Sequence, residues 1–165
     1  MSPKFNISIR RKNLSEKKIT INLSSYKKTI EKILTLLPSS HFQGCETVEL
    51  SVLLTDNNYI AELNNDYRGK KSPTDVLSFP IDTEFHEIGH KILGDIVISV
   101  EKAEEQGASN GLKRSQEMTV LTLHGLLHLL GYTHQQGTQE RIEMQDIEAS
   151  LLKDLNLPSG GLMSR

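Results

Sequence analysis

The spacing of apolar residues along the chain predicts a mixture of strands and helices. Apolar and polar residues alternate over Phe5–Arg10 as FNISIR, which is typical of a strand with one buried face. Short apolar runs predict three further strands at 48–54, 76–81 and 93–100, and the last run is rich in β-branched residues. We therefore expect a small mixed sheet of four strands.

Five other segments have apolar residues at helical spacing. Ser24 or Ser25 can cap the first of them, Asp56 the second and Ser99 the third. The predicted helices cover about 25–36, 57–68, 100–110, 115–130 and 138–155. The expected fold class is α+β: one domain over residues 1–165, with a four-stranded sheet covered by about five helices and a flexible tail at 157–165.

The helix predicted at 115–130 differs from the others because it is apolar on almost every side. Six of its positions are leucine: 121, 123, 126, 127, 129 and 130. A helix without a polar face must be surrounded by the rest of the domain.

Three histidines fall within the segment HGLLHLLGYTH, which begins at His124 near the end of that helix. His124 and His128 are four positions apart, so they share one helix face with their Cβ atoms about 6 Å apart. Gly131 suits a left-handed turn that ends the helix and folds the chain back. We expect this turn to bring His134 to the same metal ion.

Three imidazoles around one ion indicate zinc, which binds histidine nitrogen at roughly 2.0–2.1 Å. Three protein ligands leave the fourth position open, as in catalytic zinc sites, whereas structural sites are closed by a fourth ligand. Zinc in such a site lowers the pKa of a water molecule to about 7. We expect one Zn²⁺ per chain on a zincin-like helix, with His124 acting in catalysis as well as in metal binding.

The spacing H-x-x-x-H-x-x-G-x-x-H is that of metzincin peptidases, which place a glutamate base directly after the first histidine. This chain has Gly125 at that position, which argues against a peptidase. A glycine there would instead let a backbone or a substrate approach closely.

The remaining histidines and the single cysteine have ordinary interpretations. His41, His86 and His90 are expected to be surface residues, and Cys45 a half-buried apolar one. One cysteine allows no internal disulfide, which fits a reducing compartment. The sequence shows no signal-peptide pattern and no run of roughly 20 apolar residues, so we expect a cytoplasmic protein without a membrane partner.

The net charge of −2 gives no overall attraction to nucleic acid, but its distribution is uneven. Residues 1–80 carry 12 Lys+Arg against 8 Asp+Glu, and residues 81–165 carry 7 against 13. Basic clusters such as 10–12 and 68–71 form either a phosphate-facing patch or a solvated surface. Aromatic residues make up only 5%, which argues against a platform of stacking aromatics as the main RNA-binding device.

Two further segments accompany the histidine motif. Residues 64–80 read NNDYRGKKSPTDVLSFP and residues 93–99 read LGDIVIS. Together with HGLLHLLGYTH, and in this order, they make the chain resemble the YbeY family of bacterial rRNA maturation factors over about residues 45–155. The family usually has aspartate where this chain has Thr133, a departure that bears on the support of His134 and removes no ligand.

The resemblance implies a single-strand-specific metalloendoribonuclease, a hydrolase that matures the 3′ end of 16S rRNA in the small subunit and acts in ribosome quality control. It implies single-stranded RNA, rRNA, the small ribosomal subunit and its assembly factors as partners, and no DNA. In the family's pattern His124, His128 and His134 match the zinc ligands, and Arg68 matches a functionally important arginine.

Phosphodiester chemistry agrees with this pattern. Arg68 presents a fork of donors that suits a phosphate, and it does not lose its proton. We expect Arg68 to act in catalysis and in substrate binding, and Lys70 and Lys71 to help hold the RNA backbone.

Three polar residues of the matching segments have no assigned role. Ser78 and Asp95 are expected to shape the loop or the surroundings of the metal ligands. Asp75 is either part of those surroundings or a turn residue before the strand at 76–81.

Two other functions are compatible with the sequence. A zinc-dependent hydrolase of a peptide or a small ester would need a carboxylate from elsewhere as its base. A non-enzymatic ribosome-assembly factor would use the zinc for shape alone.

Overall fold

The computed structural model describes residues 2–17, 19–81, 88–133 and 138–158. The strands in this part of the chain are β1 (Lys4–Arg11), β2 (Thr47–Thr55), β3 (Val76–Pro80) and β4 (His90–Ser99). The helices are α1 (Leu23–Leu36), α2 (Asn57–Arg68), α3 (Val100–Ser109), α4 (Arg114–Leu129) and α5 (Thr138–Asp154), with 3₁₀ turns η1 (Ser15–Lys17) and η2 (Ser39–Phe42). The predicted α+β class is confirmed.

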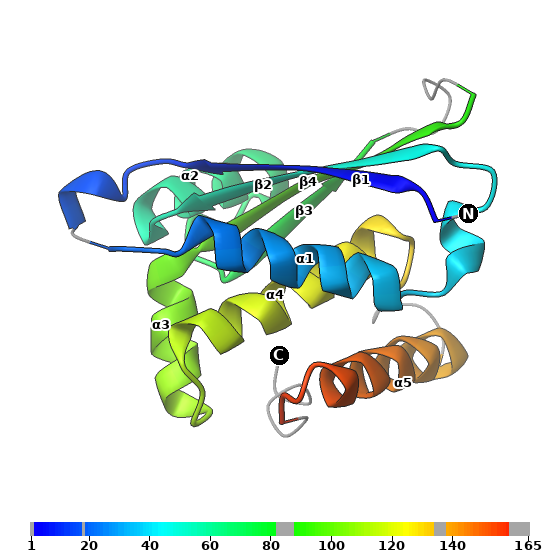
Figure 1. The fold of residues 1–165 in the computed structure, drawn as a ribbon. Helices are drawn as coiled ribbons and strands as arrows, with labels where there is room; N and C mark the ends of the chain where they lie inside the picture. Colours follow the sequence, from blue (N-terminus) through cyan, green and yellow to red (C-terminus); the bar gives the residue numbers. More distant parts are fainter. Residues whose placement is uncertain (1, 18, 82–87, 134–137, 159–165) are drawn as a thin grey trace.

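The four strands form one mixed sheet in the order β1-β2-β4-β3 (Figure 1). β1 pairs with β2 and β2 with β4 in parallel, whereas β3 pairs with β4 antiparallel. β3 is therefore an edge strand. It lies beside the predicted site residues Arg68, His124 and His128.

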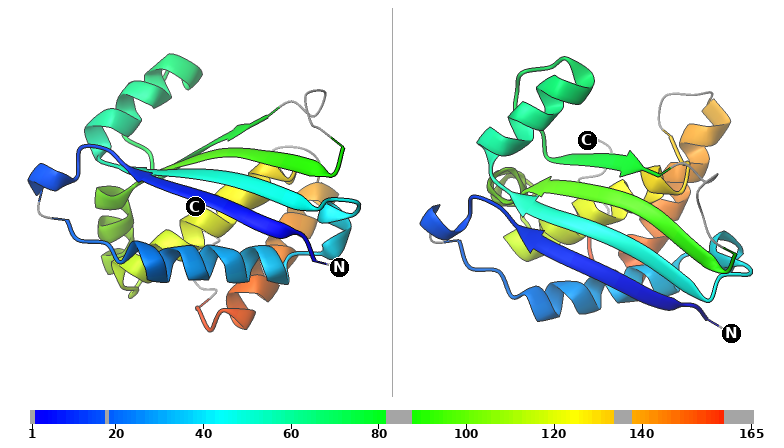
Figure 2. Two further views of the ribbon diagram at one scale, coloured as in Figure 1. Left: turned by 45° about the horizontal axis from the view of Figure 1, so that its top comes forward. Right: turned by 90° about the horizontal axis from the view of Figure 1, so that it is seen from above.

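α4 packs against β3 and β4 of the sheet, and α1 packs against β1 on the same side. Figures 1 and 2 show α1, α4 and α5 on one side of the sheet, with α4 next to it. Leu121, Leu123, Leu126 and Leu127 of α4 are each at most 1% exposed. The helix is apolar on all sides because it has neighbours on all sides, as its sequence predicted.

The opposite face of the sheet is covered only in part, by α2. Ile60 of this helix packs with Leu77 of β3 and Val97 of β4 in a second, smaller apolar cluster. The tip of α2 extends beyond this cluster toward the edge strand β3. This arrangement leaves a stretch of the sheet face open beside the C-terminal end of α2.

The helix caps follow the sequence with one correction. The α1 cap is Asn22, whose side chain accepts from Ser25 N at 3.0 Å, so the prediction of Ser24 or Ser25 was wrong. Asn22 precedes them in an extended conformation, which leaves its amide oxygen facing the first free N–H groups of the helix. The predicted caps of α2 and α3, Asp56 and Ser99, are confirmed.

β4 begins earlier than its apolar run indicated. His90 is the first residue of the strand, where its Nε2 donates to Glu49 Oε2 at 2.7 Å and its Nδ1 bonds the Thr47 hydroxyl. The side chain is 28% exposed, so the prediction of an ordinary surface histidine was wrong. His86 and the tail residues 159–165 lie outside the described residues.

A bulge in β4 brings α4 and β3 close together. The register with β2 shifts between Glu49 and Leu50, where Gly94 follows one extra residue. Gly94 has φ +133°, and a Cβ built there would lie 2.3 Å from Phe79 O and 3.1 Å from Leu129 Cδ2 at the end of α4. The close approach of the three elements requires glycine at this position.

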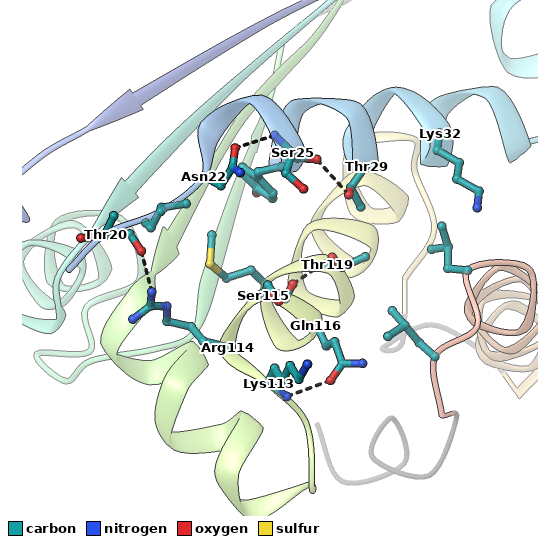
Figure 3. Close-up of a pocket in the computed structure, with 15 residues that line it drawn as sticks. Thr20, Asn22, Ser25, Thr29, Lys32, Lys113, Arg114, Ser115, Gln116 and Thr119 are labelled. Atoms are coloured by element: carbon teal, nitrogen blue, oxygen red, sulfur yellow. Dashed lines mark hydrogen bonds between the residues drawn. The ribbon is translucent and has the colours of Figure 1, made fainter.

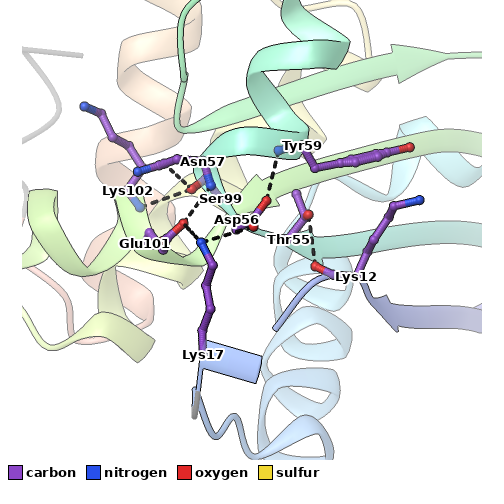
Figure 4. A network of polar contacts seen from close by, with 9 residues as sticks. All are labelled: Lys12, Lys17, Thr55, Asp56, Asn57, Tyr59, Ser99, Glu101 and Lys102. Carbon is purple, nitrogen blue, oxygen red and sulfur yellow. Dashed lines mark hydrogen bonds and ion pairs between the residues drawn. The ribbon is translucent and has the colours of Figure 1, made fainter. Parts of the chain in front are cut away.

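A polar network joins η1 to the beginnings of α2 and α3 (Figure 4). Lys17 Nζ lies 3.1 Å from both Asp56 Oδ2 and Glu101 Oε1, and Glu101 also accepts from Asn57 N at 2.8 Å. Burial alone would raise the pKa of Asp56, but the Tyr59 N–H and the Lys17 ammonium outweigh it and lower the pKa. The network therefore fixes the start of the helix whose other end carries Arg68.

Within the described part of the chain, no helix combines the length and apolar character needed to cross a membrane.

Replacing Gly94 by alanine should lower the free energy of unfolding by at least about 2 kcal/mol, through the positive φ and the clash with Phe79 O. A chain of this size then loses about 4 °C or more in Tm. Gly111 is the matched control, because its φ is +72° and, chain neighbours aside, no atom of the described residues lies within 4 Å of its Cβ position. Thermal unfolding of both variants measures the difference, and equal losses would contradict the close approach.

The stabilisation from the Asp56 charge should disappear in acid. The pKa of Asp56 is lowered from 3.8, so the stabilisation from its charge is fully present above that value and is lost as the pH falls below it through the lowered pKa of the folded state. Asp56→Asn keeps a capping side chain and removes only the charge. Urea unfolding should find wild type more stable than Asp56→Asn near neutral pH, with the gap closing below about pH 4. A pH-independent gap would show that the charge contributes nothing.

Candidate metal centre and cleft

The last turn of α4 brings two predicted ligands together. His124 Nε2 and His128 Nε2 are 2.9 Å apart, and the ring centroids are 4.5 Å apart. Gly131 follows with φ +98° and turns the chain away from the helix axis, as predicted. The spacing of four residues has therefore placed both rings on one helix face.

Each ring is oriented by a hydrogen bond from its other nitrogen. His124 Nδ1 donates to Glu148 Oε1 of α5 at 2.8 Å, and His128 Nδ1 donates to the Tyr132 carbonyl oxygen at 3.0 Å. A proton on Nδ1 leaves the Nε2 lone pair available for a metal, so these partners select the ligand tautomer in both rings.

The two rings fit a metal ion of the zinc type. Two nitrogens bound to one tetrahedral ion at about 2.05 Å would be about 3.3 Å apart, a few tenths of an ångström from the observed separation. Among the described residues no three histidine, cysteine or acidic side chains converge as a complete metal site. The third predicted ligand, His134, lies outside the described residues.

The histidines open into a cleft of about 720 Å³. One wall is the start and length of β3, another is the end of α4 with the turn after it, and the tip of α2 contributes Tyr67 and Arg68. Arg68 is exposed and lines the same cleft as His124 and His128. Lys70 and Lys71 are exposed in the loop after α2 and are not part of the cleft wall.

Gly125 faces the sheet. A Cβ added there would lie 3.2 Å from Ile96 Cγ2 and 3.2 Å from Ser78 Oγ, and the Ser78 hydroxyl donates to Gly125 O at 3.2 Å. The glycine therefore lets α4 approach β3 and β4 closely. The close approach expected at Gly125 is therefore between the backbone of α4 and the sheet.

Asp75 is both a turn residue before β3 and part of the surroundings of the cleft, the two alternatives left open for it. Its Oδ1 accepts from Val76 N at 2.8 Å, as in a turn before the strand, and the residue also lines the cleft. When the side-chain amide of Gln106 is oriented with its nitrogen toward the two carboxylates, it donates to Asp75 Oδ2 at 3.2 Å and to the buried Glu117 Oε1 at 3.3 Å. Asp95 is exposed on the opposite face of the sheet and lines a different hollow, so its expected place near the ligands was wrong.

His41 is a structural partner of the cleft, which corrects its prediction as a surface residue. Its Nε2 lies 2.9 Å from the Tyr132 hydroxyl, and Lys91 Nζ donates to its carbonyl oxygen. Burial, with a smaller effect of Lys91, lowers the pKa of His41. Because the Tyr132 carbonyl orients His128, this contact anchors the turn that holds a ligand.

Sequence reasoning missed Glu148. Its side chain is 3% exposed, yet it is a carboxylate in an otherwise amphipathic helix. It lies 24 residues from His124, so no local spacing relates the two. The available signal was that a buried imidazole that binds metal needs an acceptor for its second nitrogen.

A second cavity of about 580 Å³ lies away from the histidines, between the start of α4, the first half of α1 and the end of α5 (Figure 3). Among the described residues, its lining contains lysine and arginine but no histidine or carboxylate. Arg114 donates to Thr20 O at 2.7 Å, and Lys113 N donates to Gln116 Oε1 at 2.8 Å. The first bond joins α4 to the segment before α1, and the second caps the start of α4 itself.

The fold and the site define an α+β protein with two convergent histidines at the end of a buried helix. The sequence matches the family model described as Endoribonuclease YbeY over residues 11–156. It is 47% identical over 113 residues to Endoribonuclease YbeY of Aquifex aeolicus, covering 68% of this chain and 74% of the relative. It is 39% identical over 144 residues to the Persephonella marina protein of the same name, covering 87% and 89%.

This chain therefore belongs to the Endoribonuclease YbeY family, and the predicted family is confirmed. A protein of Thermotoga maritima with a known solution structure aligns over 91% of both chains, with a TM-score of 0.54 and 24% identity. That likeness shows a shared fold.

Replacing Glu148 by glutamine should weaken metal binding by about 10- to 100-fold. Glutamine keeps the shape and an acceptor oxygen, but it removes the charge that supports the His124 ring. Competition with a chromogenic chelator measures the zinc affinity. Asp146→Asn, at an exposed position of the same helix, is the matched control and should bind zinc as wild type does. If the two variants bind zinc with equal affinity, Glu148 does not support the metal site.

Proposed function

We propose that this chain is a metal-dependent endoribonuclease that cuts single-stranded RNA, and that its substrate in the cell is precursor rRNA at the 3′ end of the small-subunit 16S rRNA. The observation that carries the proposal is the cleft itself. It combines two histidine Nε2 atoms 2.9 Å apart with an exposed arginine in the same concave surface. The names of the relatives agree with RNA as the substrate.

His124, His128 and His134 would hold one zinc-type ion. A bound ion of this kind acts as a Lewis acid that stabilises negative charge on a phosphoryl oxygen. Glu148 and the Tyr132 carbonyl keep the two described rings in the ligand tautomer, and so prepare the site before the substrate arrives.

Arg68 would bind the scissile phosphate. The transition state of phosphodiester cleavage carries more charge on its non-bridging oxygens than the ground state does, and a guanidinium can donate to two of them at once. The end of α2 is a fixed position for this group, because Asp56 caps its start and Gly69 ends it with φ +68°.

Lys70 and Lys71 lie outside the cleft wall, so their contribution would be long-range attraction of the RNA backbone. The proposal also includes the small ribosomal subunit and its assembly factors as partners and the cytoplasm as the location, both of which stay predictions. A peptidase is disfavoured, because position 125 carries no carboxylate and faces Ile96 and Ser78.

Arg68→Ala should lower kcat/KM for a single-stranded RNA roughly 100-fold, the usual cost of losing one transition-state donor. Lys70→Ala, at an exposed neighbouring position, is the matched control and should lose less than about threefold, mostly in KM. Cleavage is followed on end-labelled RNA with and without chelator, and casein serves as the alternative substrate. All variants are purified in parallel with His124→Ala to detect a contaminating nuclease. Chelator-sensitive cleavage of casein without cleavage of RNA would refute the proposal.

A further inference from the structure

Tyr67 is the one aromatic side chain in the described residues that is largely exposed, at 68%. It lies in the last turn of α2, directly before Arg68. Its ring meets the ring of Phe79 on β3 edge to face, with centroids 4.9 Å apart and an angle of 61° between the planes. The contact holds the tyrosine in place while most of its surface remains in water.

The aromatic pair stands between two hollows. Both residues line the metal cleft of about 720 Å³, and both line a second hollow of about 340 Å³ on the open face of the sheet. A ligand that fills the cleft and extends over the sheet must therefore cross the exposed ring of Tyr67.

The second hollow is bordered by positive charge. Arg10 of β1 lines it, and Lys12 Nζ lies 4.4 Å from the ring centroid of Tyr59, which also lines it (Figure 4). Asp95 is the one carboxylate in the described lining. Arginine and lysine attract phosphates, and a carboxylate accepts hydrogen bonds from the amino group of a base.

We propose that Tyr67 and Phe79 form a stacking shelf for one RNA base next to the scissile phosphate, and that the strand continues from the cleft over this shelf toward Arg10. The inference rests on the proposed endoribonuclease function and adds the path of the substrate. A ring held at the rim by Phe79 loses little conformational entropy when a base stacks on it.

The shelf also gives a physical basis for acting on single strands. A base inside a duplex is covered on both faces by its neighbours, whereas an unpaired base can stack on a tyrosine. The low aromatic content of the chain excludes a broad platform, but one shelf needs only two rings. Its effect should be confined to one nucleotide of the substrate.

The test uses the full chain with its metal and a set of short single-stranded RNAs, one unmodified and the others with a single abasic site moved along the sequence. Tyr67→Ala should lower kcat/KM for the unmodified RNA about 5- to 150-fold, since a base stacked on an aromatic is worth about 1–3 kcal/mol. Tyr67→Phe keeps the ring and should stay within about twofold of wild type. Ile142→Ala, at an exposed apolar position of α5, controls for loss of surface bulk.

The abasic series separates stacking from a merely structural role. Wild type should be slowed by an abasic site at one position beside the cut, and Tyr67→Ala should be insensitive to it, so that the two changes are not additive. If the effects of Tyr67→Ala and of the abasic site are additive, or if Tyr67→Ala has wild-type activity, the stacking shelf is refuted. The proposed cleavage of RNA is not affected by either result. If the wild-type chain cleaves none of the RNAs, the proposed function itself fails, and the shelf with it.

Discussion

The structure depends on one constraint: α4 must be enclosed on every side and yet present two imidazoles to solvent at its end. Enclosure comes from the sheet on one side and from α1, α3 and α5 on the others, and four leucines of the helix are at most 1% exposed. Imidazoles that are mostly shielded from water require hydrogen-bond partners for their inward nitrogens. The neighbouring elements supply them, because α5 brings Glu148 and the turn after Gly131 brings the Tyr132 carbonyl.

The same enclosure sets how closely the layers approach. Gly125 on the helix and Gly94 on the strand lie where side chains would push α4 away from β3 and β4. With both glycines in place, the Ser78 hydroxyl reaches Gly125 O. The cleft therefore lies beside closely packed elements, and the histidines and Arg68 line it.

Much of the fold could be predicted from sequence, because its signals are local. The alternation over 5–10, the Asp56 and Ser99 caps and the all-apolar pattern of α4 each act within one element, and the structure confirms them. Apart from the α1 cap, which is a local choice between Asn22 and the serines after it, the errors have tertiary causes. β4 starts at His90 because Thr47 and Glu49 on the neighbouring strand hold that residue, and no periodicity within residues 82–92 reveals the pairing.

The site residues likewise include some that local sequence signals predict and others that depend on tertiary contacts. His124 and His128 could be paired from their spacing, since one helix turn brings them together. Arg68 could be suggested by the family resemblance, and only the packing of α2 beside β3 places it in the cleft with them. Glu148, His41 and the contact of Tyr67 with Phe79 join elements that are distant in the chain, so the sequence alone offers no geometry for them.

The hydrogen bond between His124 and Glu148 has a consequence for the order in which the protein is made. A ribosome adds the carboxylate 24 residues after the imidazole. A nascent chain that has completed α4 but not α5 already holds both histidines of the helix without the group that fixes the tautomer of the first. The prepared ligand arrangement is therefore a property of the chain only once its last described helix has been synthesised and has docked.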